Sequence, residues 1–369
     1  MHKIFEKDEL TKRERVVRTL MHREVDRVAT HEQLGYNPGV ISMYTGKNIK
    51  GFGYTMEDIG KTISMTLDSC FPFHAPVGTD EVADEYGFVY KNDNWTSWRV
   101  SRPFTDERGA KDWLCKSIKN LNRQMDNFDF DAYRRSYREH MQKLSFLTED
   151  TVIMDITATG FCEVYDRMGL EIFSFFQCEY PDILTEYMEI STRLAISRAN
   201  AAADESLTPV VLIAEDFATK QGPIFNREFL GKYHFPYVKN LVKAWHDNGL
   251  YVIYHSDGNY KKSIPDLIEC GVDGFYCLEP SCGMDIVELK NAYPQMTWAG
   301  GVDGVDLLER GTPEQVYAEV KRHIAETDAV NTGGMLIASS SEINPPVKPE
   351  NFCAMIESAD RYRNLRRKI

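Results

Sequence analysis

Residues 209–259, PVVLIAEDFATKQGPIFNREFLGKYHFPYVKNLVKAWHDNGLYVIYHSDGN, contain two strand-like runs with a helix-length segment between them. Both runs are rich in Val, Ile and Tyr and end in polar residues, which is typical of buried β-strands. The segment between them has apolar residues at helical spacing. A strand, a helix and a second strand in this order predict a parallel pair joined by a right-handed crossover.

The same pattern recurs along the rest of the chain. Further strand-like runs are TVIMDITATG (151–160), VDGFYCLEP (272–280), MTWAGGVDG (296–304) and GMLIASSSEI (334–343), with a seventh expected near SMTLDSCFPF (64–73). Among the expected helices are residues 181–205, 226–249, 261–271 and 312–327. No GxGxxG motif opens a strand–helix unit, which argues against a dinucleotide-binding fold. We therefore predict an α/β fold, a closed (β/α)8 TIM barrel.

The N-terminal section has mixed patterns, and we expect it to cover the opening of the barrel. TKRERVVRTLMHRE (11–24) predicts a helix, and PVGTDEVADEYGFVYKNDNWTSWRVSRPF (76–104) alternates as a β-hairpin or meander does. We expect a single domain over residues 1–369. Residues 1–145 would hold these additions and the first barrel strand, and residues 146–369 the regular repeats.

Composition excludes several classes of protein. The 369 residues are 43% apolar and 12% aromatic, enough for a large core. A formal net charge of -13 argues against a nucleic-acid groove. No apolar run approaches the roughly 20 residues of a membrane span, and the charged N-terminus is unlike a secretory signal. Eight cysteines without a CxxC pair are typical of reduced thiols. We expect a cytoplasmic protein with no membrane or nucleic-acid partner.

Polar residues end most of the strand-like runs. In a TIM barrel the carboxyl ends of all strands meet at one face, which carries the chemistry. The barrel would therefore make neighbours of Asp155, Thr157, Glu215, Asp216, His255, Asp257, Glu279, Asp303 and Glu342. Glu215 and Asp216 follow a nearly all-apolar strand, so we expect one of them to enter the site and the other to brace it.

His255 and Asp257 are the sharpest pair in this group. Residues at i and i+2 of an extended chain point to the same side, so the two side chains can reach one point. The alternative is a hydrogen-bonded histidine near a turn and an aspartate that caps a helix. With Glu342 and Glu279, the pair would form an N/O site for zinc or another divalent ion. Glu342 and Glu279 can equally be loop acids that face water.

The cysteines divide into two groups. Cys162, Cys270 and Cys353 lie in amphipathic or helical stretches and are expected in the core. Cys277 and Cys282 flank LEPS just after a strand, so a functional role for either stays open.

Four stretches resemble the uroporphyrinogen decarboxylase-like family. They are LTKRERVVRTLMHREVDRV (10–28), AEDFATKQGPIFNREFLGKYHFPYVKNLV (214–242), HSDGNYKKSIPDLIECGVDGFYCLEPSCGMDIVELKNAY (255–293) and GGMLIASSSEINPPVKPENFCAMIESADRYR (333–363). The family comprises TIM barrels, among them porphyrinogen decarboxylases and cobalamin-linked methyltransferases. The decarboxylases hold propionate groups with an early Arg-rich loop. The corresponding THEQLGYNPGVISMYTG (30–46) contains no Arg, which disfavours that activity.

The methyltransferases of the family bind zinc through a His-x-Cys pair and a later Cys before the last helix. His255 matches the histidine, Asp257 stands at the first Cys, and Ser341 or Glu342 stands near the second. The resemblance thus implies an oxygen-rich metal site that acts as a Lewis acid, in place of a thiolate-rich site that activates a thiol. Glu215, Asp216 and His255 are the catalytic candidates.

The resemblance implies a substrate:corrinoid methyltransferase similar to the O-demethylases of anaerobes. Such an enzyme moves a methyl group from a small donor, expected to be a methoxylated aromatic, to the Co(I) corrinoid of a partner protein. Five aromatic residues can stack on a planar donor or belong to the core: Tyr36, Phe73, Tyr254, Tyr276 and Trp298. Other readings are a decarboxylase or lyase on a small acid, with Arg99, Arg102 and Lys220 as its clamp, a methylcorrinoid:thiol methyltransferase, and a non-catalytic corrinoid or tetrapyrrole binder.

Overall fold

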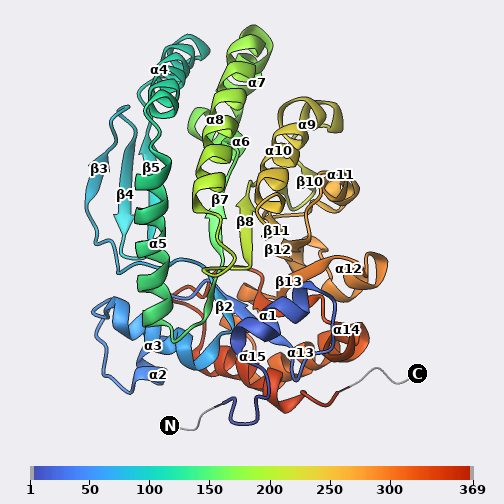
Figure 1. Cartoon of the computed structure of the whole chain (residues 1–369). Helices are drawn as coiled ribbons and strands as arrows, with labels where there is room; N and C mark the ends of the chain where they lie inside the picture. The colour runs from blue at the N-terminus through green and yellow to red at the C-terminus, as the bar shows by residue number, and fades with distance from the viewer. Residues whose placement is uncertain (1–3, 366–369) are drawn as a thin grey trace.

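A closed ring of parallel strands forms the centre of the computed structural model, which describes residues 4–365 (Figure 1). The ring consists of β1 (Ala29–Glu32), β2 (Ser69–Cys70), β6 (Val152–Ile153), β7 (Asp155–Thr157), β8 (Val210–Ala214), β11 (Tyr251–His255), β12 (Gly274–Tyr276), β13 (Thr297–Val302) and β14 (Met335–Ser339). β14 pairs with β1, β6 pairs with β2, and β7 pairs with β8, all in parallel. Only Met154 separates β6 from β7, so these two segments act as one barrel strand. The nine strands therefore fill the eight strand positions of the barrel. The predicted (β/α)8 TIM barrel is confirmed.

The strands bury both of their faces. Successive side chains alternate between the faces of a strand. Leu212 and Ile253 pack in the cluster inside the barrel, whereas Val211 and Ile213 join the larger cluster between the strands and the helices. Val16 and Leu20, from helix α1 (Lys12–Leu20), join the inner cluster. Helix α1 therefore closes the amino-terminal end of the barrel.

Helices surround the ring between successive strands. They are α6 (Phe161–Met168), α7 (Leu170–Glu179), α8 (Pro181–Ala202), α9 (Arg227–Tyr233), α10 (Phe235–His246), α11 (Ile264–Glu269), α12 (Ile286–Ala292), α13 (Pro313–Thr327), α14 (Ala329–Thr332) and α15 (Pro349–Arg361). The single helix expected over residues 226–249 is wrong, because α9 ends before His234 and α10 begins at Phe235. Pro236 lacks a backbone N–H and is tolerated in the first turn of a helix, so it favours a new start. Within residues 4–365, no helix has the length and hydropathy that a membrane span requires.

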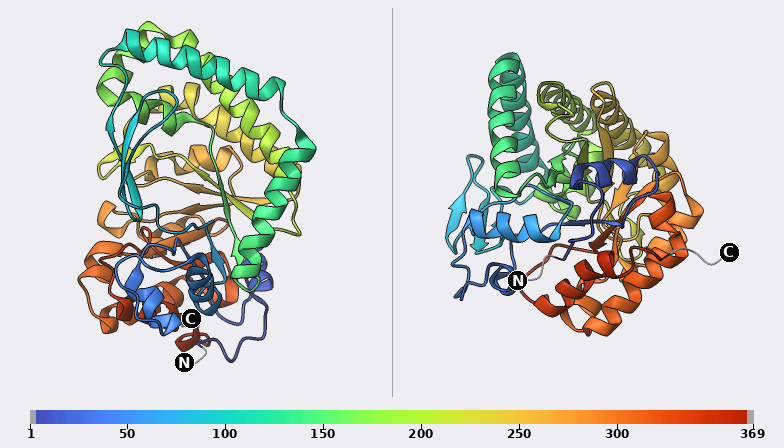
Figure 2. Two further views of the ribbon diagram at one scale, coloured as in Figure 1. Left: turned by 90° about the vertical axis from the view of Figure 1, so that its left-hand side faces the viewer. Right: turned by 60° about the horizontal axis from the view of Figure 1, so that its bottom comes forward.

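The N-terminal additions stand on one flank of the barrel (Figure 2). The expected meander is confirmed as the antiparallel strands β3 (Glu81–Ala83), β4 (Val89–Asp93) and β5 (Thr96–Ser101). The helices of this section are α2 (Pro38–Thr45), α3 (Met56–Thr66), α4 (Glu107–Asp126) and α5 (Phe130–Leu147). The sequence patterns did not predict the bounds of α4 and α5. Asp106 and Asp129 start them as N-caps, each accepting a backbone N–H through its carboxylate.

A buried ion network ties the first two barrel strands to α1. Asp68 is fully buried, and its two carboxylate oxygens lie 2.7 Å from Nη1 of Arg15 and 2.7 Å from Nη1 of Arg27. It also accepts the backbone N–H of Thr30 in β1 at 2.9 Å. Burial raises the pKa of Asp68, but Arg27 and Arg15 outweigh it and hold the pKa below its ordinary value. Asp8 and Asp26 pair with the same arginines from the less buried side, so Asp68 is the fully buried member of a shared network.

We expect Asp68→Asn to lower the free energy of unfolding by roughly 2–3 kcal/mol, because Arg15 and Arg27 each lose a buried charged hydrogen-bond partner and keep only Asp8 and Asp26. Urea unfolding measures the loss. Asp247→Asn is the matched control, since Asp247 pairs with Lys243 on an exposed helix face and should cost no more than about 0.5 kcal/mol. Equal effects of the two substitutions would contradict this role of the network.

Candidate metal-binding site at the carboxyl ends of the strands

Three neighbouring strands end in register at one face of the barrel. His255, the last residue of β11, pairs with Ala214 of β8 and with Tyr276 of β12. Asp216, Asp257 and Cys277 follow the ends of these same strands. Strand pairing therefore brings together side chains from three separate segments of the chain.

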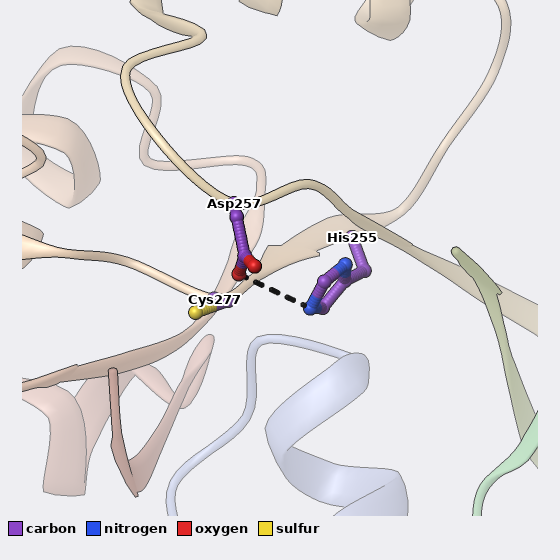
Figure 3. Close-up of side chains that lie close together, drawn as sticks. All are labelled: His255, Asp257 and Cys277. Carbon is purple, nitrogen blue, oxygen red and sulfur yellow. Dashed lines mark ion pairs between the residues drawn. The ribbon is translucent and has the colours of Figure 1, made fainter. Parts of the chain in front are cut away.

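His255, Asp257 and Cys277 form the tightest group of potential ligands (Figure 3). One ligand atom from each lies within 4.8 Å of the others. His255 Nε2 is 3.8 Å from Asp257 Oδ1, and Cys277 Sγ donates to the carbonyl oxygen of Ser340 at 2.6 Å. Figure 3 shows the Asp257 carboxylate between the imidazole and the thiol. The structure thus adds a thiol to the predicted pair.

Asp216 holds the imidazole from its other side. Its Oδ1 lies 3.3 Å from His255 Nδ1 and accepts the backbone N–H of Asp257 at 2.8 Å. Burial lowers the pKa of His255, but Asp216, with smaller contributions from Asp257 and Glu342, raises the pKa above its ordinary value. Asp216 thus lies on the Nδ1 side of the ring and Asp257 on the Nε2 side, and a carboxylate behind a metal-binding histidine orients its ring.

The donor set fits a divalent metal ion of the zinc type. Nitrogen, oxygen and sulfur donors from His, Asp and Cys are zinc ligands, and three protein ligands leave a fourth position open. Burial, together with Asp257 and Glu279, raises the pKa of the Cys277 thiol well above its ordinary value, so without a cation the thiol keeps its proton. A bound cation reverses this preference, because coordination deprotonates a thiol.

Glu215 stabilises the start of helix α6. It is fully buried, and its Oε1 accepts from the backbone N–H of Thr159 at 2.5 Å and of Gly160 at 3.0 Å. Its Oε2 accepts from the N–H of Cys162 at 2.6 Å. All three donors belong to the start of α6, whose positive end a carboxylate stabilises. Of the Glu215–Asp216 pair, Asp216 is therefore the one beside His255.

Glu279 and Glu342 lie around the cluster but outside the group of three. Glu279 accepts the N–H of Gly258 at 2.6 Å and the thiol of Cys282 at 3.3 Å. Gly258 has a φ of +77°, and a Cβ there would stand 2.8 Å from the backbone of Ala218, so this turn requires glycine. Glu342 is close enough to His255 to raise its pKa. Both carboxylates add negative charge near the site, but neither belongs to the group of three potential ligands.

The five predicted aromatic residues separate into two groups. Tyr276 faces the barrel interior, and the ring centroid of Tyr36 lies 5.9 Å from that of Trp95 in the β4–β5 turn. Tyr254 and Trp298 face outward. The Tyr254 hydroxyl lies 2.7 Å from His234 Nε2, and Trp298 stacks on Phe275. Phe73 packs beside Gly35. We therefore retain Tyr36 and Tyr276 as candidates for contact with a substrate.

Two buried residues of β1, His31 and Glu32, also lie at this face, although the sequence did not predict them there. Glu32 accepts the backbone N–H of Ser339 at 2.5 Å and its hydroxyl at 2.9 Å. Burial raises the pKa of Glu32 to about 8. The ring of His31 lies 5.3 Å from that of Tyr276. Three of the four residues of this strand, ATHE, are polar, so only the need for an eighth strand in a closed barrel could have revealed it.

A polar cavity of about 410 Å³ lies elsewhere, between α4, α8 and the end of β7. Asp155, Thr157 and Arg198 contribute to its lining, and the three clustered residues do not. Asp155 and Thr157, expected at the strand ends, therefore border this cavity rather than the cluster.

Together these features define a (β/α)8 barrel with a three-residue metal-type cluster where strands β11 and β12 end. The sequence profile of the uroporphyrinogen decarboxylase (URO-D) family matches residues 164–362, more than half of the chain. The chain belongs to this family, as its resemblance predicts.

Proteins similar to this chain are named methyltransferases. The methylcobamide:CoM methyltransferases MtbA of Methanosarcina mazei and Methanosarcina acetivorans are 24% and 22% identical to it over 182 residues. In each case the match covers 49% of this chain and 50% of the relative, so the chain spans about half the length of the curated relatives it matches. A solved methyltransferase from Methanosarcina mazei shares the fold, with a TM-score of 0.64 and 17% identity over 96% of this chain and 99% of that one.

Zinc titration against a chelator tests the ligand set. We expect His255→Ala and Cys277→Ser each to lower zinc affinity by at least about tenfold, because even changes outside the ligand shell cost roughly 10–100-fold. Cys178→Ser, at an exposed thiol, should bind zinc as the wild type does. Glu342→Gln should retain most of the affinity. A larger loss in Glu342→Gln than in Cys277→Ser would place the third ligand on the 340–343 loop instead.

The raised pKa of Glu32 predicts a pH dependence of stability. Because the folded-state pKa of about 8 lies above the ordinary 4.5, the protonated form favours folding. This contribution is fully present below pH 4.5 and is lost as the pH rises to 8, by up to about 5 kcal/mol at roughly 1.4 kcal/mol per pH unit. Glu32→Gln, which stays neutral, should flatten the difference in urea unfolding between pH 5 and pH 8. An unchanged slope would show that Glu32 titrates normally.

Proposed function

We propose that this protein is a corrinoid-dependent methyltransferase that transfers a methyl group from a small methoxylated aromatic donor to the Co(I) corrinoid of a partner protein. The observation that carries the proposal is the convergence of His255, Asp257 and Cys277 at the carboxyl ends of the barrel strands. The relatives named as methylcobamide:CoM methyltransferases support the reaction class. The proposal includes an ether oxygen as the atom that releases the methyl group and a metal of the zinc type.

The proposed transfer breaks the bond between the methyl carbon and the ether oxygen. The electron pair of Co(I) forms the new bond to the methyl group, and the oxygen departs with the pair of the broken bond. A zinc-type ion, when bound, supplies a Lewis acid that stabilises the charge on that oxygen. Asp216 fixes the imidazole of His255, and Asp257 and Cys277 add anionic donors. These residues would hold a cation in place at the open end of the barrel.

The placement of the arginines disfavours the decarboxylase reading. A carboxylate substrate needs cationic groups that converge on it. Arg99 instead pairs with Asp166 at 2.9 Å, and Arg102 donates to the carbonyl oxygen of Met168 at 2.9 Å. Both guanidinium groups are thereby engaged at the end of α6.

Cys277 favours one second candidate function, methyl transfer from a methylcorrinoid to a thiol. A thiolate ligand makes a zinc site softer and better suited to activating a thiol than an all-oxygen site is. Only one thiol stands in the cluster, however, where the methyltransferases that the sequence resembles use two. The two directions differ in which partner gives up the methyl group, so both are tested in one assay.

Corrinoid absorbance tests the proposed function. Zinc-loaded protein is mixed with cob(I)alamin and a methoxylated phenol, and conversion to methylcobalamin is followed. We expect conversion with the wild type and at least about a hundredfold slower conversion with His255→Ala, since loss of an electrostatic stabiliser costs roughly 10²–10³ in rate. Cys178→Ser serves as the control. Conversion of methylcobalamin by an added thiol, without conversion of any methoxylated donor, would favour the second candidate.

A further inference from the structure

The polar cavity between α4, α8 and the end of β7 is separate from the proposed metal site. Its volume of about 410 Å³ lies within the range of small-molecule pockets, which is roughly 300–1,000 Å³. Residues of α8 from Tyr187 to Ala202 line it, and at 1.5 Å per residue this stretch is about 22 Å long. His255, Asp257 and Cys277 do not border it. The cavity is therefore long and narrow, a shape that fits an elongated small molecule.

Small side chains on α8 keep this space open. Ser191, Ala195, Ala199 and Ala202 all line the cavity. They follow one another at intervals of three or four residues, so they lie on one face of the helix. Helix α8 still packs against α4. The open volume thus comes from the size of the side chains on α8 and not from a separation of the two helices.

Strand β7 turns polar side chains toward the cavity. Asp155 and Thr157 pair in register with Val211 and Ile213 of the parallel strand β8, and such neighbours point to the same face of a sheet. Val211 and Ile213 belong to the apolar cluster between the strands and the helices. Asp155 and Thr157 therefore face outward, where the strands of a parallel barrel ordinarily carry apolar residues. A carboxylate and a hydroxyl at these positions indicate binding rather than packing.

Several polar groups in the wall of the cavity have no protein partner. Within residues 4–365, Asp155 forms no ion pair with a basic side chain, and the hydroxyls of Ser117 and Thr157 make no hydrogen bond. The indole nitrogens of Trp113 and Trp245, which also line the cavity, are buried without a hydrogen-bond partner. A buried polar group without a partner costs free energy unless a ligand or water satisfies it. The wall therefore offers both donors and acceptors to a bound molecule.

The charges around the cavity favour an uncharged ligand. Arg167 is already paired with Glu163 at 3.1 Å, and Arg198 and Glu85 are exposed and carry opposite charges. Asp155 is the remaining ionic group, so a bound anion would face it with no free cation at its side. A bound ammonium group could pair with Asp155, but it has only donors and would leave the indole N–H groups unpaired. A hydroxyl accepts from an indole N–H and donates to a carboxylate.

We propose that this cavity binds an elongated, uncharged small molecule rich in hydroxyl groups, a sugar or another polyol. Trp113 and Trp245 donate to its oxygens, and Asp155 accepts from its hydroxyl groups. Ser117 and Thr157 can take either role. The small side chains of α8 provide the length that several hydroxyl groups in series require. This site is independent of the proposed methyl transfer.

The indole N–H signals of the full chain, labelled with ¹⁵N and loaded with zinc, test the site directly. The chain has five tryptophans, and Trp113→Phe and Trp245→Phe assign the two signals that belong to the cavity. Glycerol, glucose and maltose are titrated as uncharged polyols of increasing length, with putrescine as a cation and succinate as an anion. We expect maltose to bind most tightly and to shift both signals along one saturable curve. Trp298, whose N–H donates to the carbonyl oxygen of Tyr293 at 3.3 Å, should not respond.

Asp155→Asn tests the wall formed by β7. It should weaken maltose binding by about tenfold, because a hydrogen bond to a charged group is stronger than one to a neutral group. Asp126→Asn, at an exposed aspartate at the end of α4, is the matched control and should bind maltose as the wild type does. Far-UV circular dichroism checks that each variant is folded.

The titration of the wild type decides the proposal even if a variant does not fold. The absence of a saturable shift of either cavity signal with all three polyols would overturn it and leave the cavity to ordered water. Tighter binding of putrescine or succinate than of maltose would overturn the class of ligand. An unchanged affinity for maltose in folded Asp155→Asn would contradict the role of the carboxylate.

Discussion

The parallel register of β8, β11 and β12 is the constraint on which the candidate site depends. It aligns Ala214, His255 and Tyr276, so the residues that follow these strands leave the barrel at one level. Asp216, Asp257 and Cys277 are therefore neighbours although 61 positions separate the first from the last. A slip of one residue in β11 would turn His255 away from this face, because side chains alternate along a strand.

The same closure of the barrel sets the electrostatics of the site. Strand ends that meet at one face gather carboxylates that would otherwise lie far apart. Two of them have structural tasks, since Glu215 stabilises the start of α6 and Glu32 holds Ser339. Asp216 and Asp257 instead enclose the His255 imidazole. Acidic side chains at one face thus take different roles because their partners differ.

Much of the fold could be predicted from the sequence, because strand and helix patterns alternate strongly from residue 150 onward. β1 could not, since it is short and three of its four residues, ATHE, are polar. The break at His234 could not be predicted either, because it lies within a continuous amphipathic stretch. In the site, spacing along one strand revealed His255 with Asp257. The contribution of Cys277 depends on pairing between strands, which one sequence does not display. Alternation along β11 turns Tyr254 away from the side of His255, so its outward position could have been predicted, whereas the inward position of Tyr276 depends on the pairing of β12 with β11.

The proposed ligand set distinguishes this chain from the zinc pattern that it resembles. Aspartate stands where that pattern has its first thiol, and Cys277 supplies a thiol from another strand. X-ray absorption spectroscopy of the zinc-loaded protein tests this set directly. The account predicts one sulfur neighbour at about 2.3 Å and the remaining ligands as nitrogen or oxygen at about 2.0–2.2 Å. A spectrum with no sulfur neighbour or with two, or a protein that retains no zinc, would contradict it.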